Sequence, residues 1–122
     1  MQMTVLSTQV LNIINIYRSK YDNTLKEILT REIDSKIQTP TLVIGDFNIC
    51  YKENPNNKVS RTLQKRGFFQ TVNEATHIEG GHIDHVYFGG GNITDVSNVN
   101  TSLYSAYYTF HDHDCILITV KV

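Results

Sequence analysis

Cysteine is scarce in this sequence, with only Cys50 and Cys115 among 122 residues. Two cysteines cannot form the disulfide framework of a small secreted domain, so the pair fits reduced thiols better. No apolar stretch is long enough to span a membrane, and the first residues lack the basic-then-apolar order of a signal peptide. These absences exclude a disulfide scaffold and predict an intracellular protein, nuclear or cytoplasmic, without a membrane partner.

Net charge is small as well, at −1, but the charges are unevenly distributed. The first 66 residues carry ten Lys and Arg against six Asp and Glu, whereas the remainder carries one against six, together with all five histidines. Acids and histidines gathered in this way suit a divalent-cation or proton-transfer site, and a basic half suits a partner that bears phosphates. Chance unevenness in a short chain is the alternative explanation.

The apolar pattern predicts one α/β domain without repeats or linkers. A strand over residues 10–17 is too continuously apolar to have one face in water, so we expect burial on both faces. The strand over residues 41–44 is followed by Gly45, where the backbone can turn sharply. Further strands are expected over residues 3–7, 68–72, 82–88, 93–99 and 115–122, with an aromatic stretch over 104–110.

Two helices are predicted between these strands. Thr24 and Glu27 have the spacing of a capping box, and apolar residues then recur at helical intervals as far as Ile37. A shorter helix is expected over about residues 59–66, where Gly67 would end it. Its candidate caps are Asn57 and Ser60.

Three polar clusters each lie at the end of a predicted strand: Asp46 with Asn48, Asp84 with its flanking histidines, and residues 111–114 just before the last strand. Strand ends and the adjoining loops are where rigid backbone positions side chains for catalysis. If the extended geometry persists through Phe47, Asp46 and Asn48 point to one side. Phosphodiester hydrolysis uses such groups, because carboxylates bind Mg²⁺ and orient water while imidazole and amide groups stabilise the phosphate.

Each cluster also has a simpler explanation. Asp46 can close the strand in an Asx turn that needs no chemistry. His85 can be a satisfied core residue, and His82, beside two glycines, an exposed one. Residues 111–114 suggest a transition-metal site, but adjacent residues rarely converge on one ion.

Three motifs occur in a fixed order: Gly-Asp-Phe-Asn at 45–48, Gly-x-Ile-Asp-His-Val at 81–86, and Asp-His at 112–113 before a terminal apolar strand. This order resembles the endonuclease/exonuclease/phosphatase superfamily of deoxyribonuclease I-like enzymes. The segments 15–17 and 75–77 look most like its mobile-element endonuclease domains. The resemblance implies a four-layer αββα sandwich with mainly antiparallel or mixed sheets, of which residues 1–122 would be the carboxyl-terminal half.

The resemblance also implies roles for individual residues. Asp46 would orient or activate the attacking water and bind metal, and Asn48 would contact the phosphate. Tyr17 would approach the phosphate or the leaving group, with Arg18 beside it on the substrate. These groups would serve a Mg²⁺-dependent enzyme, or one that uses Mn²⁺, acting on nucleic acid and on DNA rather than RNA.

Two further carboxylates complete the implied site. Asp84 would orient the catalytic His113, since a carboxylate fixes the tautomer of an imidazole and raises its pKa. Asp112 would be a metal-associated acid. Lys20 stands where many relatives have asparagine, and His111 where serine is usual.

The family's amino-terminal half normally supplies a glutamate that is the principal Mg²⁺ ligand, and no such segment precedes Met1. A larger polypeptide would then have to supply the other half. Two alternatives follow: an inactive truncated remnant or binding module, and a phosphatase or phosphodiesterase acting on inositol phosphates or lipids.

Overall fold

The computed structural model describes residues 1–77, 80–91, 99–104, 113 and 115–120. Within these residues no helix is long and apolar enough to cross a membrane. The elements in chain order are β1 (Gln2–Ser7), β2 (Asn12–Tyr17), α1 (Leu25–Lys36), β3 (Thr41–Asp46), α2 (Lys58–Lys65), β4 (Phe69–Gln70), β5 (Asp84–Gly89), β6 (Val99–Tyr104) and β7 (Cys115–Val120).

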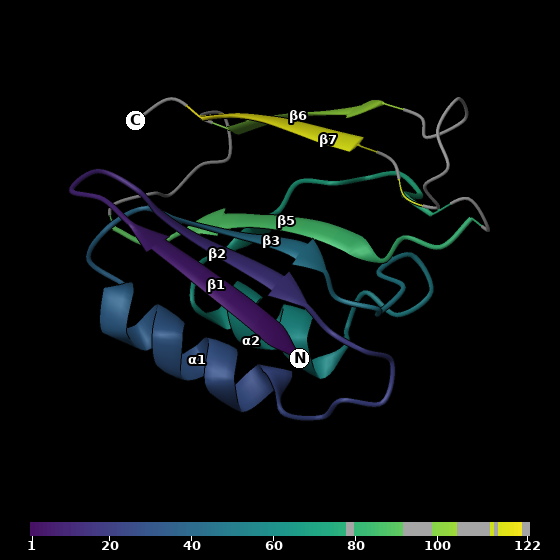
Figure 1. The fold of residues 1–122 in the computed structure, drawn as a ribbon, viewed down its shortest axis with the longest axis horizontal. Coiled ribbons are helices and arrows are strands. Elements are labelled where there is room, and N and C mark those ends of the chain that lie inside the picture. The colour runs from purple at the N-terminus through teal and green to yellow at the C-terminus, as the bar shows by residue number, and fades with distance from the viewer. Residues whose placement is uncertain (78–79, 92–98, 105–112, 114, 121–122) are drawn as a thin grey trace.

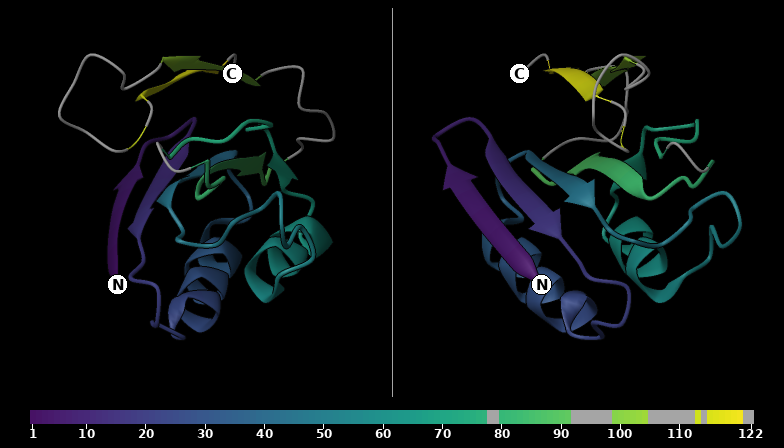
Figure 2. Two further views of the ribbon diagram at one scale, coloured as in Figure 1. Left: turned by 90° about the vertical axis from the view of Figure 1, so that its right-hand side faces the viewer. Right: turned by 45° about the vertical axis from the view of Figure 1, so that its right-hand side comes forward.

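Three layers are visible in Figures 1 and 2: the two helices, a five-stranded sheet, and a two-stranded sheet on the far side. The larger sheet has the strand order β1-β2-β3-β5-β4. Its β2–β3 pair is parallel and its other pairs are antiparallel. The smaller sheet pairs β6 with β7 in antiparallel register. The predicted α/β class with mixed sheets is confirmed, and the arrangement fits part of an αββα sandwich.

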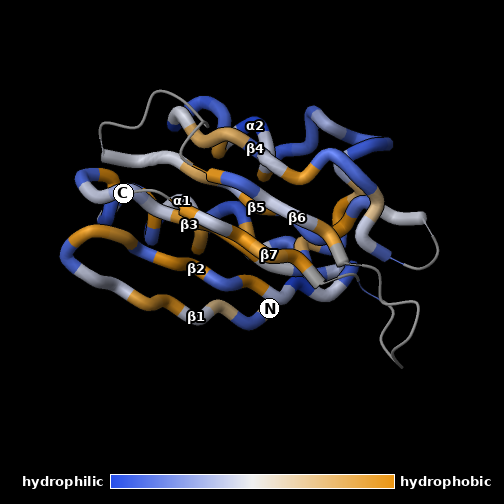
Figure 3. Tube along the Cα trace, turned by 90° about the horizontal axis from the view of Figure 1, so that it is seen from above, coloured by the Kyte–Doolittle hydropathy of each residue, from blue (hydrophilic) through white to orange (hydrophobic). Residues whose placement is uncertain are grey.

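Apolar side chains pack on both faces of the larger sheet, because side chains alternate along each strand. In β3, Val43 packs toward the helices, whereas Leu42 and Ile44 pack toward β6 and β7. Figure 3 shows the smaller sheet over β3 and β5, with β1 extending beyond it. The helix-side cluster includes Ile14, Ile16, Leu25, Leu29, Ile33, Phe47, Leu63, Phe68 and Tyr87.

The predicted burial of β2 on both faces is wrong. Ile14 and Ile16 are buried against the helices, but Asn15 and Tyr17 on the opposite face are exposed. The smaller sheet lies over the central strands, and among the described residues no strand or helix covers this end of β2.

The helix caps are predicted correctly at one helix only. The Asn57 side chain accepts a hydrogen bond from the Ser60 amide at 2.9 Å and caps α2. Thr24 makes no side-chain cap at α1, because its backbone is already helical and its hydroxyl donates to Asp22 at 2.6 Å. The expected capping box with Glu27 is therefore wrong.

Two of the expected strands differ most from the structure. The expected strand over 68–72 shortens to β4. The one expected over 93–99 shares only Val99 with β6, and residues 92–98 lie outside the described part of the chain. The aromatic stretch is described only at Tyr104, and the closing strand is described as far as Val120.

Candidate functional site

A row of polar residues crosses three neighbouring strands at one end of the larger sheet. Tyr17 of β2 is the register partner of Asp46 in β3, and Asp46 is the partner of Asp84 in β5. Because alternate residues share a face, Asp46 lies on the face of Ile44, and Asp84 on the face of Val86. Both carboxylates therefore lie on the face that packs against the smaller sheet.

His113 joins the two carboxylates. Its Nδ1 lies 2.7 Å from Asp84 Oδ2, and its Nε2 lies 3.6 Å from Asp46 Oδ2. A carboxylate only accepts hydrogen bonds, so Nδ1 carries the proton toward Asp84 and Nε2 faces Asp46. One atom from each of the three side chains lies within 4.8 Å of the others. We call Asp46, Asp84 and His113 the carboxylate–imidazole cluster.

The electrostatics of the cluster raise the pKa of Asp46. Burial is the main cause, and the nearby Asp84 charge acts in the same direction. A hydrogen bond from the Asn48 amide, at 2.9 Å to Asp46 Oδ1, opposes the shift. A carboxylate of raised pKa is a stronger base, so this environment makes Asp46 a better proton acceptor.

The loop after Asp46 is not extended, so the condition under which Asp46 and Asn48 would point to one side is not met. Asn48 has φ +51°, which places it in the left-handed region that asparagine tolerates. The bond from its amide to Asp46 Oδ1 forms the Asx turn that was the simpler explanation of the motif. Phe47 is fully buried. Asp46 therefore closes the strand and also belongs to the carboxylate–imidazole cluster.

Arg18 contacts this loop. Its amide donates to the Asp46 carbonyl at 2.9 Å, and its Nη1 lies 3.3 Å from the Phe47 carbonyl and 3.4 Å from the Asn48 carbonyl. Part of its hydrogen-bonding capacity therefore holds the loop. Tyr17, in contrast, is 53% exposed at the end of the polar row.

The sequence matches no protein-family model and no curated protein sequence. Three solved structures resemble the fold. They are CdtB, the biologically active subunit of cytolethal distending toxin (TM-score 0.67, 12% identity), cytolethal distending toxin from Actinobacillus actinomycetemcomitans (0.66, 14%), and the endonuclease domain of TRAS1, a telomere-specific non-LTR retrotransposon (0.69, 11%). The chain has part of the deoxyribonuclease I-like fold.

The match covers 97–98% of this chain but only 51%, 52% and 60% of the three neighbours. The chain thus spans about half the length of the structures it resembles. The resemblance read from the three motifs is confirmed at the level of the fold.

The cluster's donor chemistry fits a divalent cation in this deoxyribonuclease I-like fold. Mg²⁺ binds oxygen ligands and is commonly held by one or two carboxylates together with substrate phosphates. Asp46 and Asp84 offer such oxygens, whereas the imidazole of His113 is a ligand that Mg²⁺ rarely takes. Asp112 and His111 lie outside the described residues, so the expected metal role of Asp112 stays a prediction.

Residues 76 and 77 support the cluster, although the sequence suggested no role for them. The Asp84 amide donates to the Thr76 hydroxyl at 3.1 Å, and Thr76 is fully buried. The His77 ring meets the His113 ring edge-on, with centroids 5.0 Å apart. Their position just before the Asp84 motif was the only sequence signal that could have pointed to them. The ring contact depends on a β-bridge between His77 and His113, which are 36 residues apart in the chain.

His82 and His85 hold the loop from the core side. His82 is only 3% exposed, so the alternative explanation that it is an exposed residue is wrong. Its carbonyl accepts from the Tyr51 amide at 2.9 Å. His85 is fully buried and stacks on Phe47, with centroids 4.7 Å apart. The alternative reading of His85 as a core residue is correct.

The hydrogen bonds of His85 determine its tautomer. Nε2 lies 2.8 Å from the Ile49 carbonyl and 3.1 Å from the His82 carbonyl, and carbonyls only accept, so Nε2 carries the proton. Nδ1 therefore accepts from the Tyr87 hydroxyl at 3.1 Å. That hydroxyl accepts in turn from Ser60, 2.6 Å away. The chain of bonds connects the amino-terminal turn of α2 to the loop that follows Asp46.

Burial lowers the pKa of His85 to about 4, despite opposing hydrogen bonds to the carbonyls. Above about pH 6.5 the residue is neutral in both folded and unfolded chains, and its full contribution is present. As pH falls below 6.5 the unfolded chain binds the proton first, so stability is lost. Between pH 7.5 and pH 5 we expect His85 to cost about 2 kcal/mol of unfolding free energy.

Urea denaturation at the two pH values measures this loss. His85→Asn is the comparison, because the shared effects of His82, whose pKa is also lowered, and of Asp46, whose pKa is raised, cancel in the difference. A pH dependence as steep in His85→Asn as in the unchanged chain would contradict the prediction.

Proposed function

We propose that this chain is the carboxyl-terminal half of a metal-dependent phosphodiesterase that hydrolyses nucleic acid, with DNA rather than RNA as substrate. The observation that carries the proposal is the carboxylate–imidazole cluster, in which one imidazole lies between two half-buried carboxylates. The cluster stands at the end of three strands, with the exposed Tyr17 beside it. Acid, base and phosphate-binding groups are thus gathered on one accessible edge.

Each protein group has a separate role when water attacks the phosphorus atom. Asp46 orients the water and accepts its proton. Asp84 holds the His113 ring so that its Nε2 side faces the scissile phosphate. Asn48 contacts a non-bridging oxygen of the phosphate. Their common effect is to stabilise charge that develops in the transition state, the largest single contribution in many enzymes.

The remaining roles concern substrate and metal. Tyr17 approaches the phosphate or the leaving group, and Arg18 binds the strand with the donors that the loop does not use. Asp46 and Asp112 hold Mg²⁺, for which Mn²⁺ can substitute. The ion supplies positive charge against the phosphate oxygens when bound.

A second polypeptide segment is part of the proposal. The solved structures are about twice the length of the matched region, and the other half of the sandwich would supply a further metal ligand. Leu6 and Leu117, 58% and 52% exposed, lie on sheet surfaces that such a segment could cover. The same half-length match favours one other candidate, an inactive truncated remnant or binding module.

Metal removal tests the proposed reaction. The purified chain, with the rest of the sandwich supplied, is incubated with supercoiled plasmid in Mg²⁺, in Mn²⁺ and in excess chelator, and nicked circles are quantified on a gel. We expect nicking with either metal and none with chelator, because the transition state loses several kcal/mol of stabilisation without the ion. Parallel assays on inositol phosphates and sphingomyelin test the substrate class.

The outcomes separate the candidates. Metal-dependent nicking supports the enzyme. DNA binding without nicking, when the rest of the sandwich is also supplied, supports the binding module. Turnover of the small phosphates alone would contradict a nuclease.

A further inference from the structure

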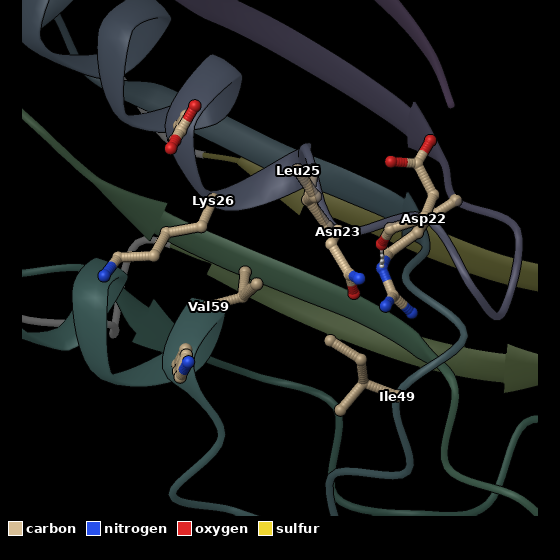
Figure 4. Close-up of a pocket in the computed structure, with 9 residues that line it drawn as sticks. Asp22, Asn23, Leu25, Lys26, Ile49 and Val59 are labelled. Atoms are coloured by element: carbon tan, nitrogen blue, oxygen red, sulfur yellow. Dashed lines mark hydrogen bonds between the residues drawn. The ribbon is translucent and has the colours of Figure 1, made fainter.

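A cavity of about 630 Å³ lies between the two helices and the loop that follows Asp46. Figure 4 shows Lys26 and Val59 on one side of it, with Ile49 and Asn23 across from them. Its lining includes Arg18, Leu25, Lys26, Ile49, Lys58 and Val59.

The cavity and the carboxylate–imidazole cluster lie on opposite faces of the larger sheet, and both contact the loop that follows Asp46. Arg18, which lines the cavity, directly follows Tyr17 of the polar row and contacts the Phe47 and Asn48 carbonyls. Ile49, also in the lining, is the next residue of that loop. The cavity lining therefore includes one residue of the loop that carries Asn48 and one residue that binds this loop.

Three cations line this cavity. Lys26 and Lys58 are exposed, and among the described residues neither forms a salt bridge. The hydrogen bonds of the Arg18 side chain use Nε and Nη1, and within the described part of the chain Nη2 makes none. One face of the guanidinium thus keeps donors for a further acceptor.

The lysine positions are electrostatically unusual. Lys26 is the second residue of α1 and Lys58 is the first of α2, where the helix dipole disfavours a positive charge. The first turn of α2 contains no acidic residue to compensate. An anion in the cavity would offset the unfavourable interaction of both lysines with the helix dipoles.

The lining carboxylates do not cancel this charge. Asp22 already accepts from the Thr24 amide at 2.9 Å and lies 2.6 Å from the Met1 ammonium, and these bonds hold its pKa well below the usual range. Glu27 is left as the one other acidic residue in the lining. The three cations outnumber this one carboxylate, so the cavity lining keeps an excess of positive charge.

We infer that this cavity binds a backbone phosphate of the nucleic-acid strand, one that flanks the phosphodiester held at the carboxylate–imidazole cluster. The inference rests on the proposed function and adds a second contact point on the same strand. Lys26 and Lys58 neutralise the phosphate, and Arg18 donates to it from Nη2. The apolar floor of Leu25, Ile49 and Val59 faces the sugar. A polyanion fits better than a free phosphate, because one strand that passes around the loop after Asp46 can contact both sites.

Salt-dependent binding tests this site without any need for catalysis. A fluorescein-labelled single-stranded 12-mer is titrated with the chain in excess chelator, and anisotropy is followed over a series of salt concentrations. For Lys26→Gln/Lys58→Gln we expect an affinity about tenfold lower and a log K against log salt slope smaller by about 0.7, the value for one phosphate of a single strand.

Arg31→Gln/Lys65→Gln is the matched control, since it removes two exposed helical cations that do not line the cavity. Its slope should stay within error of the unchanged chain. Equal losses in the two double variants, or no binding by the unchanged chain, would overturn the inference.

Amide chemical shifts give a second measurement that does not depend on any variant. Addition of the unlabelled 12-mer should shift the amides of residues 25–27 and 58–60, and unshifted amides there would also overturn the site. Failure of the proposed function looks different: the plasmid is not nicked, while the loss of affinity in Lys26→Gln/Lys58→Gln remains.

Discussion

Asp46→Asn is expected to lower metal-dependent plasmid nicking at least about 10³-fold, equivalent to about 4 kcal/mol of transition-state stabilisation. The substitution removes the charge that would hold the metal and accept the proton from water. It keeps an oxygen that can accept from the Asn48 amide, so the Asx turn and the loop should persist. Initial nicking rates at saturating Mg²⁺ measure the effect.

The control for this variant is Asp34→Asn. Asp34 is a 54% exposed carboxylate on α1 that pairs with Arg66 at 2.8 Å, and it belongs to neither the cluster nor the cavity. Its rate should stay within about twofold, because exposed ion pairs contribute little. Asp46→Asn retaining a tenth or more of the unchanged rate would remove Asp46 from the proposed chemistry.

Gly45→Ala is expected to destabilise the fold by about 4 kcal/mol or more, a large part of the stability of a small domain. A Cβ on Gly45 would lie 1.9 Å from the Ile16 carbonyl oxygen, and this backbone atom belongs to the neighbouring β2. The residue also has φ +135°, which L side chains rarely adopt. Urea denaturation followed by circular dichroism measures the loss.

Gly67→Ala separates the clash from the backbone preference. Gly67 also has a positive φ, +79°, but a Cβ there would meet nothing within 4 Å. We expect it to cost about 1 kcal/mol, the usual penalty for a side chain in the left-handed region. If Gly45→Ala unfolds no more easily than Gly67→Ala, the close approach of β2 and β3 is not as described.

The reason for Gly45 could not be predicted from the sequence. A glycine after an apolar run indicates a turn, yet Gly45 lies inside β3, where it pairs with Ile16 on one side and His85 on the other. What requires glycine is the carbonyl of a strand 29 residues earlier in the chain. Local pattern carries no information about such a contact.

The surroundings of Thr24 and His82 could not be predicted from the sequence for a related reason. The Thr24–Glu27 spacing predicts a capping box, but the Thr24 hydroxyl and amide both donate to the Asp22 carboxylate instead. His82 beside two glycines suggests exposure, but the loop that follows Asp46 covers it. In each case a neighbour outside the motif decided the outcome.

The sequence by itself determined the alternation of strands and helices, the caps of α2 and the order of three motifs that resembles deoxyribonuclease I-like enzymes. These features depend on residues close together in the chain or on a linear order. Only the tertiary structure decided that Asp46 and Asp84 are register partners, that His113 lies between them, and that Arg18 connects their loop to a cationic cavity. Register and sheet packing set these distances, because a shift of one residue in a strand would turn each carboxylate to the opposite face.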